Sequence, residues 1–369
     1  MHIEGTLHGE EIHVGGDARQ RFYDARGYGR PLGGNDVALS RVEAAHLLYR
    51  GDLDGVDVDG RSNAFEEFFV DAAAAGDRFA LRFLVYADLR ERGFYLSPVR
   101  DGWPGDRAVE ADVSGRADFA VYARGDGPPD GSVAYRVRVV GERERLPAAE
   151  LTGVLAIVDE ESDLTYFETG TPSMDGTTSY DLPTTLGGVL LADRVVVWDA
   201  PESLYDRGFY GQPLSGRTGP VEDALQLSLV EAAALAADGV LSLTAVVGDG
   251  DLPTVDTQAF DAIVERGREV EGERFDRRLR VYRGLRDAGV VPKTGFKFGA
   301  DFRTYANVET VEELPHSEAL VRVLPPDHVF DPRELSLDVR LAGGVRKRMV
   351  FALTDGNTVE YRSVARLTP

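Results

Sequence analysis

The chain has 369 residues, of which 43% are hydrophobic, and it contains no cysteine. This length is enough for roughly two to four small domains, and the lack of cysteine excludes disulfides and thiolate metal sites. No apolar run is long enough to span a bilayer, and the N-terminal segment "MHIEGTLHGEEIHVGG" lacks the features of a signal peptide. We therefore expect a soluble protein of the cytoplasm.

The charge of the chain is unevenly distributed. The formal net charge is −22, from 63 acidic and 41 basic residues, and the lysines are only Lys293, Lys297 and Lys347. An acid-rich surface with little lysine is typical of proteins that work at very high salt, so we infer a halophilic source. From Pro292 to Pro369 the chain has eleven basic and eleven acidic residues, so the whole excess of acid lies before this segment. This neutral C-terminal segment is where an anion could bind.

Two copies of one sequence unit make up the chain. In the first half "FYDARGYGRPL" begins at Phe22 and "SRVEAAHLL" at Ser40, and they recur as "LYDRGFYGQPL" at Leu204 and "SLVEAAALA" at Ser228. Three further matches follow in the same order, including "ADFAVYA" with "ADFRTYA". A stretch rich in Gly, Ser, Thr and Pro, residues 167–188, is expected to join the copies. The predicted subdomains are 1–75 and 76–170 in the first copy, and 188–270 and 271–369 in the second.

The first half of the second copy predicts one strand and then helices. "LADRVVVWD" has the composition of a strand, and "TGPVEDALQLSLVEAAALAADG" is predicted as a helix with Pro220 near its start and Gly239 beyond its end. Another helix is expected at about 256–266. In "ERFDRRLRVYRGLRDAG" the spacing of the apolar residues predicts a helix that buries one face, made of Phe275, Leu279, Tyr282 and Leu285.

Short apolar segments follow and predict strands at 290–291, 296–298, 302–305 and 319–324. "FDPRELSLDVRLAGG" then predicts a helix with Asp331 as its cap, Pro332 in its first turn and Gly343–Gly344 at its end. Lys347 comes directly before the strand "RMVFALTD".

The two copies differ where the second has chemically active side chains. Tyr305 has a counterpart in Tyr122, but His316 has none, because Gly131 or Ser132 stands there. Lys347 aligns with Leu151, and the residues between Val140 and Leu151 are too few for the helix at 331–342. Degeneration of a duplicated site explains this pattern.

The motifs "GFKFGADFRTY", "LPHSEALVRV", "VRLAGGVRKR" and "MVFAL" resemble those of the archaeal tRNA-intron endonucleases, in the fused two-repeat form that works as a homodimer. The resemblance implies an α+β fold, in which each copy has a helix-bearing N-terminal α+β subdomain and a small mixed α/β catalytic-type subdomain, degenerate in the first copy. One departure is "AGG" before "VRKR", where relatives often carry a His-Ser pair.

This resemblance also implies an activity. The family cuts precursor tRNA at bulge-helix-bulge junctions without metal or cofactor and leaves a 2′,3′-cyclic phosphate and a 5′-hydroxyl. Tyr305 would be the general base, His316 the general acid and Lys347 the stabiliser of the transition state. Histidine suits such an acid because its reference pKa is about 6.5. Arg340 and Arg362 match the arginines with which the opposing subunit sandwiches a flipped base.

Other interpretations are open at this point. Tyr305 could be a core aromatic residue and His316 an ordinary loop residue, and His328 is a rival histidine that no family motif covers. Lys293 and Lys297 could contact RNA or pack on the strands. The whole chain could be a non-catalytic RNA-binding or structural subunit of a splicing endonuclease. A metal-dependent nuclease is the third hypothesis, although no group of carboxylates has ligand spacing.

Overall fold

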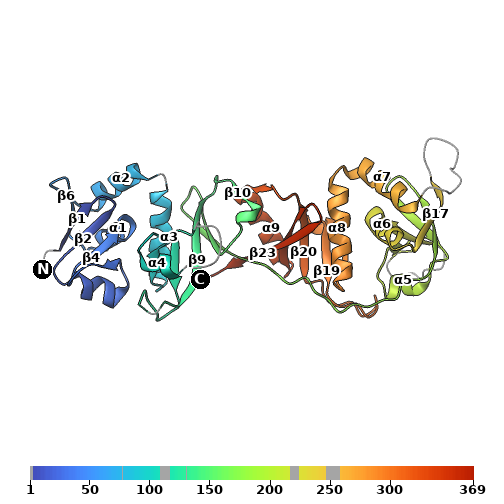
Figure 1. Cartoon of the computed structure of the whole chain (residues 1–369), viewed down its shortest axis with the longest axis horizontal. Coiled ribbons are helices and arrows are strands. Elements are labelled where there is room, and N and C mark those ends of the chain that lie inside the picture. Colours follow the sequence, from blue (N-terminus) through green and yellow to red (C-terminus); the bar gives the residue numbers. More distant parts are fainter. Residues whose placement is uncertain (1–2, 77, 109–116, 130, 217–223, 247–257) are drawn as a thin grey trace. The chain divides into compact units, whose positions relative to one another are not determined.

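The computed structural model describes residues 3–76, 78–108, 117–129, 131–216, 224–246 and 258–369. They form two compact units, each with helices and mixed sheets (Figure 1). Unit 1 comprises Met1–Gly170, Val329–Leu335 and Ala365–Pro369, and unit 2 comprises Thr171–His328 and Ser336–Val364. None of the helices in the described part of the chain is both long and apolar enough to cross a membrane.

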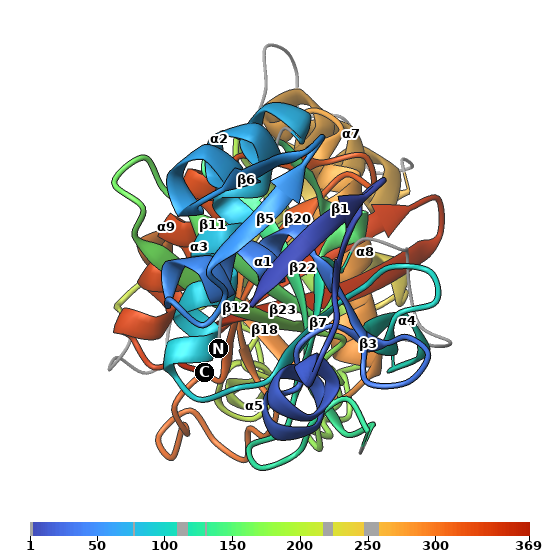
Figure 2. The same cartoon turned by 90° about the vertical axis from the view of Figure 1, so that its left-hand side faces the viewer.

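Unit 1 begins with a six-stranded sheet in the order β3-β4-β2-β1-β5-β6. Strands β1 and β5 run parallel and side by side (Figure 2). The elements of this part are β1 (Glu4–His8), β2 (Glu11–Val14), the π-helix η1 (Arg19–Asp24), β3 (Arg30–Pro31), β4 (Val37–Ser40), α1 (Arg41–Tyr49), β5 (Gly55–Val58), β6 (Arg61–Asn63) and α2 (Phe65–Ala75).

The second part of unit 1 contains a run of strands in the order β12-β11-β9-β8-β7. Its elements are α3 (Phe79–Glu91), β7 (Leu96–Pro98), α4 (Pro104–Ala108), β8 (Phe119–Tyr122), β9 (Val133–Gly141), β10 (Leu146–Pro147), the 3-10 turn η2 (Ala148–Glu150), β11 (Val154–Val158) and β12 (Leu164–Gly170). The short strand β21 (Val329–Phe330) pairs with β10. The sequence between β9 and β11 thus forms a short strand and one 3-10 turn, which agrees with the predicted loss of a helix from this copy.

Unit 2 repeats this plan. Its first part is a five-stranded sheet in the order β15-β16-β14-β13-β17. The elements are β13 (Leu186–Leu190), β14 (Arg194–Trp198), α5 (Glu202–Asp206), β15 (Gln212–Pro213), β16 (Ala224–Ser228), α6 (Leu229–Ala237), β17 (Leu241–Val246) and α7 (Ala259–Glu271).

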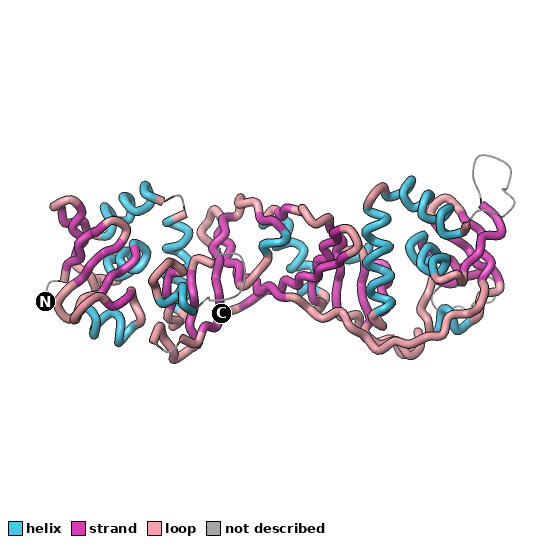
Figure 3. Tube along the Cα trace, viewed as in Figure 1, coloured by secondary structure: helices cyan, strands magenta, loops and turns pink. Residues whose placement is uncertain are grey.

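A mixed sheet with the order β18-β19-β20-β22-β23 forms the second part of unit 2. The elements are α8 (Arg274–Asp287), β18 (Val291–Thr294), the 3-10 turn η3 (Phe296–Phe298), β19 (Phe302–Tyr305), β20 (Ala319–Leu324), α9 (Pro332–Gly344), β22 (Arg348–Asp355) and β23 (Thr358–Leu367). The first residues of α9 and the last of β23 are assigned to unit 1. Strands β19 and β20 are antiparallel, whereas β20 and β22 are parallel. Helix α8 stands between the two sheets of the unit (Figure 3).

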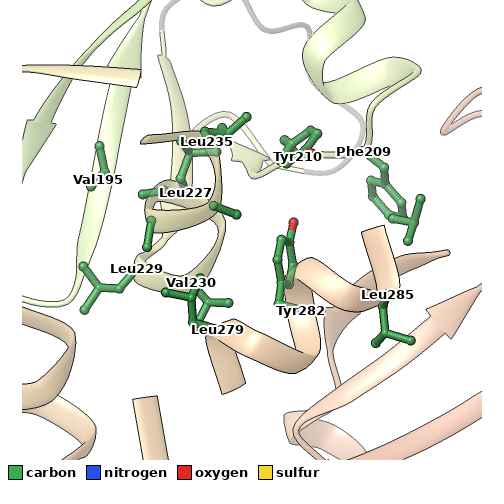
Figure 4. Packing of buried hydrophobic residues seen from close by; sticks show 14 of the residues in the cluster. Val195, Phe209, Tyr210, Leu227, Leu229, Val230, Leu235, Leu279, Tyr282 and Leu285 are labelled. Carbon is green, nitrogen blue, oxygen red and sulfur yellow. The ribbon is translucent and has the colours of Figure 1, made fainter. Parts of the chain in front are cut away.

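The core of unit 2 explains why α8 forms where the sequence predicts it. The four residues of its apolar stripe, Phe275, Leu279, Tyr282 and Leu285, are all buried. They belong to one cluster with residues of α6 such as Leu229 and Val230 (Figure 4). Burying such a stripe stabilises a helix more than its intrinsic propensity does. The prediction of this helix and of its buried face is confirmed.

Helix α9 is also confirmed. The Asp331 carboxylate accepts a hydrogen bond of 2.9 Å from the backbone N–H of Arg333, so Asp331 caps the helix as expected. The helix continues through Gly343 and Gly344, which were expected to end it.

Two predicted elements differ in the structure. The helix expected from Pro220 to Gly239 is a strand, β16, followed by a shorter helix, α6; Pro220 itself lies outside the described residues. The Ser228 side chain and Glu231 form a capping box, which starts the helix at Leu229. The segment Phe296–Phe298 is a 3-10 turn rather than a strand, and Phe296 is 85% exposed. The turn ends at Gly299, whose φ of +70° favours glycine.

Candidate active site

The topology of unit 2 brings Tyr305, His316 and Lys347 to one end of a sheet. Tyr305 is the last residue of β19, and His316 lies in the loop just before β20. Since β19 and β20 are antiparallel, the end of the first lies beside the start of the second. Strand β22 is parallel to β20, so its start, which Lys347 precedes, lies at the same end. Three residues distant in sequence are therefore neighbours around one sheet edge.

Tyr305 is held by aromatic packing. It is 7% exposed, and its ring meets that of Phe209 edge to face with 5.7 Å between centroids. Tyr305 also lines a pocket of about 600 Å³ in unit 2. Within the described residues its hydroxyl makes no hydrogen bond. The phenol is therefore fixed in place while its oxygen is available to a ligand.

Lys347 is tied to the loop that carries His316. Its ammonium donates a hydrogen bond of 2.6 Å to the backbone carbonyl of Ser317, the residue next to His316. Its Nζ also lies 6.0 Å from the ring centroid of Phe298. Partial burial and the positive charge of Arg303 hold the pKa of Lys347 below the usual range for lysine. A phosphate bound here would favour the charged form again.

His316 is exposed, and among the described residues it has no hydrogen-bond or ion-pair partner. Its imidazole is free to meet a substrate that approaches from solvent. The rival histidine, His328, lies beyond the far end of β20, after Leu324. The strand direction therefore puts His328 at the opposite end of the sheet from Tyr305.

The two arginines identified from the sequence, Arg340 and Arg362, differ in the contacts that restrain their side chains. Arg340 is exposed on α9, and no acidic partner of it occurs in the described residues. Arg362, on β23, forms an ion pair with Glu360 and donates a hydrogen bond of 2.8 Å to the Thr171 hydroxyl. Arg362 is thus held by its own chain, whereas Arg340 projects without an ionic restraint.

Lys293 and Lys297 have different environments. The ammonium of Lys293 lies 2.6 Å from the Glu231 carboxylate and donates to the carbonyls of Phe209 and Gly211. These three acceptors satisfy its three donors, so Lys293 has a structural role. Lys297 is exposed in η3, next to Phe298, and within the described residues no hydrogen bond or ion pair restrains its side chain.

Of these groups, the first copy keeps only the tyrosine at the matching positions. Tyr122 is fully buried, and burial raises its pKa to about 12. Leu151, which aligns with Lys347, is also buried. Ala120 stands where the second copy has Arg303, two residues before the tyrosine. We did not single out Arg303 from the sequence, although the pair "ADFAVYA" and "ADFRTYA" contains the signal.

The described residues include no group of three or more histidine and carboxylate side chains placed to hold a metal ion. What the second copy offers at this sheet edge is a phenol, an imidazole, an ammonium and a guanidinium. Such a set can move protons and stabilise negative charge.

Comparison with known proteins places this site in a family. Residues 275–361 match the description "tRNA intron endonuclease, catalytic C-terminal domain". Residues 3–69 and 186–252 both match "tRNA intron endonuclease, N-terminal domain", which confirms the predicted duplication and the α+β fold class.

Three relatives named tRNA-splicing endonuclease cover nearly all of the chain. The protein from Halobacterium salinarum is 56% identical over 373 residues and that from Haloferax volcanii 55% over 372, each with 100% of both chains covered. The one from Methanosarcina mazei is 39% identical over 380 residues, with 99% of both chains covered. The acid-rich composition agrees with the halophilic relatives among them. This chain belongs to the tRNA-splicing endonuclease family.

Proposed function

We propose that this chain is a tRNA-intron lyase that excises introns from precursor tRNA at bulge-helix-bulge junctions without a metal ion. The observation that carries the proposal is the meeting of Tyr305, His316 and Lys347 at one sheet edge of the second copy. The first copy buries its tyrosine completely and has neither a lysine nor an α-helix at the matching positions. Reactive side chains that occur in only one of two copies of a fold are expected where that copy catalyses a reaction.

The proposed reaction is an in-line transfer at phosphorus. Tyr305, as general base, takes the proton of the 2′-hydroxyl as this oxygen attacks the adjacent phosphate. The bond from phosphorus to the 5′-oxygen breaks, and His316 gives that oxygen its proton. Lys347 stabilises the extra negative charge of the phosphorane between these steps. The products are a 2′,3′-cyclic phosphate and a 5′-hydroxyl, so the atoms and protons balance.

We further propose that the chain acts as a cytoplasmic homodimer. One chain has one complete set of catalytic groups, yet an intron is released by two cuts, one in each bulge. A two-fold symmetric dimer supplies two equivalent sites. In this arrangement Arg340 and Arg362 of one subunit would stack on a flipped base at the site of the other, since a planar guanidinium can pack on an aromatic ring.

The proposal is tested by incubating the purified chain with an intron-bearing transcript in concentrated KCl and excess EDTA. We expect two cuts, and end-group analysis of the fragments should show cyclic phosphates and 5′-hydroxyls. Cleavage that EDTA abolishes and that only Mg²⁺ or Mn²⁺ restores would contradict the proposed mechanism. Binding of the transcript without cleavage would favour the alternative, a non-catalytic RNA-binding or structural subunit.

A further inference from the structure

Arg303 lies beside the proposed catalytic tyrosine. It precedes Tyr305 by two residues on β19, and alternate residues of a strand point to the same face of the sheet. The central carbon of its guanidinium is 5.8 Å from the centroid of the Tyr305 ring. Both side chains line the same pocket of about 600 Å³. The guanidinium is thus part of the surroundings of the Tyr305 hydroxyl.

Arg303 differs from the other cations of this pocket because its charge is not neutralised. The Nε of Arg303 is buried without a hydrogen bond, and in the described part of the chain the side chain forms no ion pair. The three other cationic side chains that line the pocket each have a carboxylate partner. These pairs are Arg194 with Asp193, Arg278 with Glu271, and Lys293 with Glu231.

The positive charge of Arg303 also reaches Lys347. It is one of the causes that lower the pKa of this lysine, which shows that the two cations repel each other. Apart from the Ser317 carbonyl, no described acceptor is hydrogen-bonded to Lys347. An anion that contacted both cations would remove this repulsion and satisfy the buried donor of Arg303.

The first copy shows that the fold does not need this arginine. Strand β8 contains Ala120 at the matching position and pairs with β7 and β9. The tyrosine two residues later is kept as Tyr122, while the counterpart of Lys347 is Leu151. Arginine, lysine and histidine are therefore absent together from the first copy, in which the tyrosine is fully buried. This pattern fits a role in binding an anion and does not fit a role in holding the strand.

We propose that Arg303 is a second cation of the active site, which contacts a non-bridging oxygen of the scissile phosphate together with Lys347. This inference rests on the proposed function, because it assigns the anion to the RNA. Two donors of the planar guanidinium can bind one phosphate oxygen or two. Arg303 would stabilise the phosphorane while Tyr305 and His316 move the protons, and the same contact would orient the phosphate next to the Tyr305 hydroxyl.

The test compares Arg303→Ala, which copies Ala120 of the first copy, with the wild-type chain in single-turnover cleavage of a bulge-helix-bulge RNA. Arg194→Gln is the matched control, because Arg194 lines the same pocket but is neutralised by Asp193. Binding is measured with an RNA that carries 2′-deoxy groups at both cleavage sites. Each reaction is repeated with millimolar guanidinium chloride, which can occupy the space left by the side chain.

We expect Arg303→Ala to cut roughly 10²-fold more slowly, to bind the deoxy RNA within about threefold of the wild type, and to regain rate with guanidinium. Arg194→Gln should cut like the wild type and gain nothing. A rate for Arg303→Ala within threefold of the wild type would overturn the inference, as would a slow rate that guanidinium leaves unchanged.

Two further comparisons keep the inference testable. If Arg303→Ala does not fold, Arg303→Lys and Arg303→Gln replace it, and the charged lysine variant must cut at least about tenfold faster than the glutamine variant. Equal rates would contradict a role for the charge. Failure of the wild-type chain to cut the RNA at all would instead overturn the proposed function, so the two failures are distinct.

Discussion

The two copies of the sequence unit have the same helix cap, but the glutamate of this cap has different neighbours in each copy. Glu43 and Glu231 each complete a capping box, with Ser40 and Ser228. Burial alone would raise the pKa of both carboxyls. In the first copy it prevails, and the pKa of Glu43 rises to about 7. In the second copy burial is outweighed by the ammonium of Lys293 together with hydrogen bonds from the backbone N–H groups of Ser228 and Gly211, so that the pKa of Glu231 falls to about 2.

This difference shows what each copy retained. The second copy carries an interior ion pair, Lys293 with Glu231, directly beside β19, the strand of the proposed catalytic tyrosine, because Lys293 pairs with Arg303 across β18 and β19. The first copy has Ser97 and Ala120 in the corresponding strand pair. The fold is common to both copies, whereas charged groups are concentrated in the one that we propose to be catalytic.

The largest expected effect concerns the proposed catalytic groups. His316→Ala and Lys347→Ala should each slow single-turnover cleavage by roughly 10²- to 10⁴-fold, since each removes a proton donor or a charge that we propose acts in the transition state. RNA affinity, measured with the 2′-deoxy substrate, should change little. A loss of affinity as large as the loss of rate would show that these residues bind RNA and do not catalyse.

Breaking the interior ion pair is expected to affect stability rather than chemistry. Glu231→Gln leaves the Lys293 ammonium buried without a charge partner, which should cost about 3–5 kcal/mol of unfolding free energy. Glu43→Gln is the matched variant in the first copy, and it should cost only about 1–2 kcal/mol, because it weakens hydrogen bonds and leaves no buried charge uncompensated. Denaturant unfolding at pH 7 measures both. Equal costs would contradict the contrast between the copies.

Because the pKa values of these two glutamates shift in opposite directions, their contributions to stability should depend on pH in opposite ways. The pKa of Glu43 is raised from 4.5 to about 7, so its contribution to stability is present below pH 4.5 and is lost as pH rises through 7. The pKa of Glu231 is lowered from 4.5 to about 2, so its contribution is present above pH 4.5 and is lost as pH falls toward 2.

Between pH 7 and 4.5 the wild type should therefore gain about 2–3 kcal/mol relative to Glu43→Gln. Relative to Glu231→Gln it should stay nearly constant over that range and lose stability only below it. Unfolding curves of the three chains across this range check the signs. A gain of the wild type over Glu231→Gln on acidification would contradict the assignment.

A smaller effect is expected from the arginines that would act across the dimer. Arg340→Lys should slow cleavage about tenfold despite the unchanged charge, because an ammonium cannot stack as a guanidinium does. A mixed dimer of a Lys347→Ala chain with an Arg340→Ala/Arg362→Ala chain should place both defects at one site and cut one bulge at a near-normal rate. If that dimer cuts neither bulge, Arg340 and Arg362 do not act across subunits.

Much of the fold could be predicted from the sequence because local patterns determine it. The apolar stripe of α8 and the bounds of β19 and β20 follow from periodicity and turn residues. The helix predicted at 220–239 failed because a strand and a capped helix adjoin without a Gly or Pro between them. The role of Lys293 could not be predicted, since its partner, Glu231, is 62 residues away and only the packed unit joins them.

The members of the candidate site could be proposed from the sequence, but their spatial arrangement could not. Tyr305, His316 and Lys347 follow from motifs that resemble a family. Their meeting at one edge depends on the strand order β19-β20-β22, which no local pattern specifies. Arg303 escaped notice because an arginine in a strand is unremarkable until its lack of a partner in the described residues is visible.

The most direct test of the central claim, that only the second copy cuts RNA, compares Tyr305→Phe with Tyr122→Phe. Each change removes one hydroxyl from matching positions of the two copies. Single-turnover cleavage of an intron-bearing transcript in EDTA should fall by roughly 10²-fold or more for Tyr305→Phe. Tyr122→Phe should cut at the wild-type rate, because its ring is fully buried. Equal losses in the two variants would contradict the account.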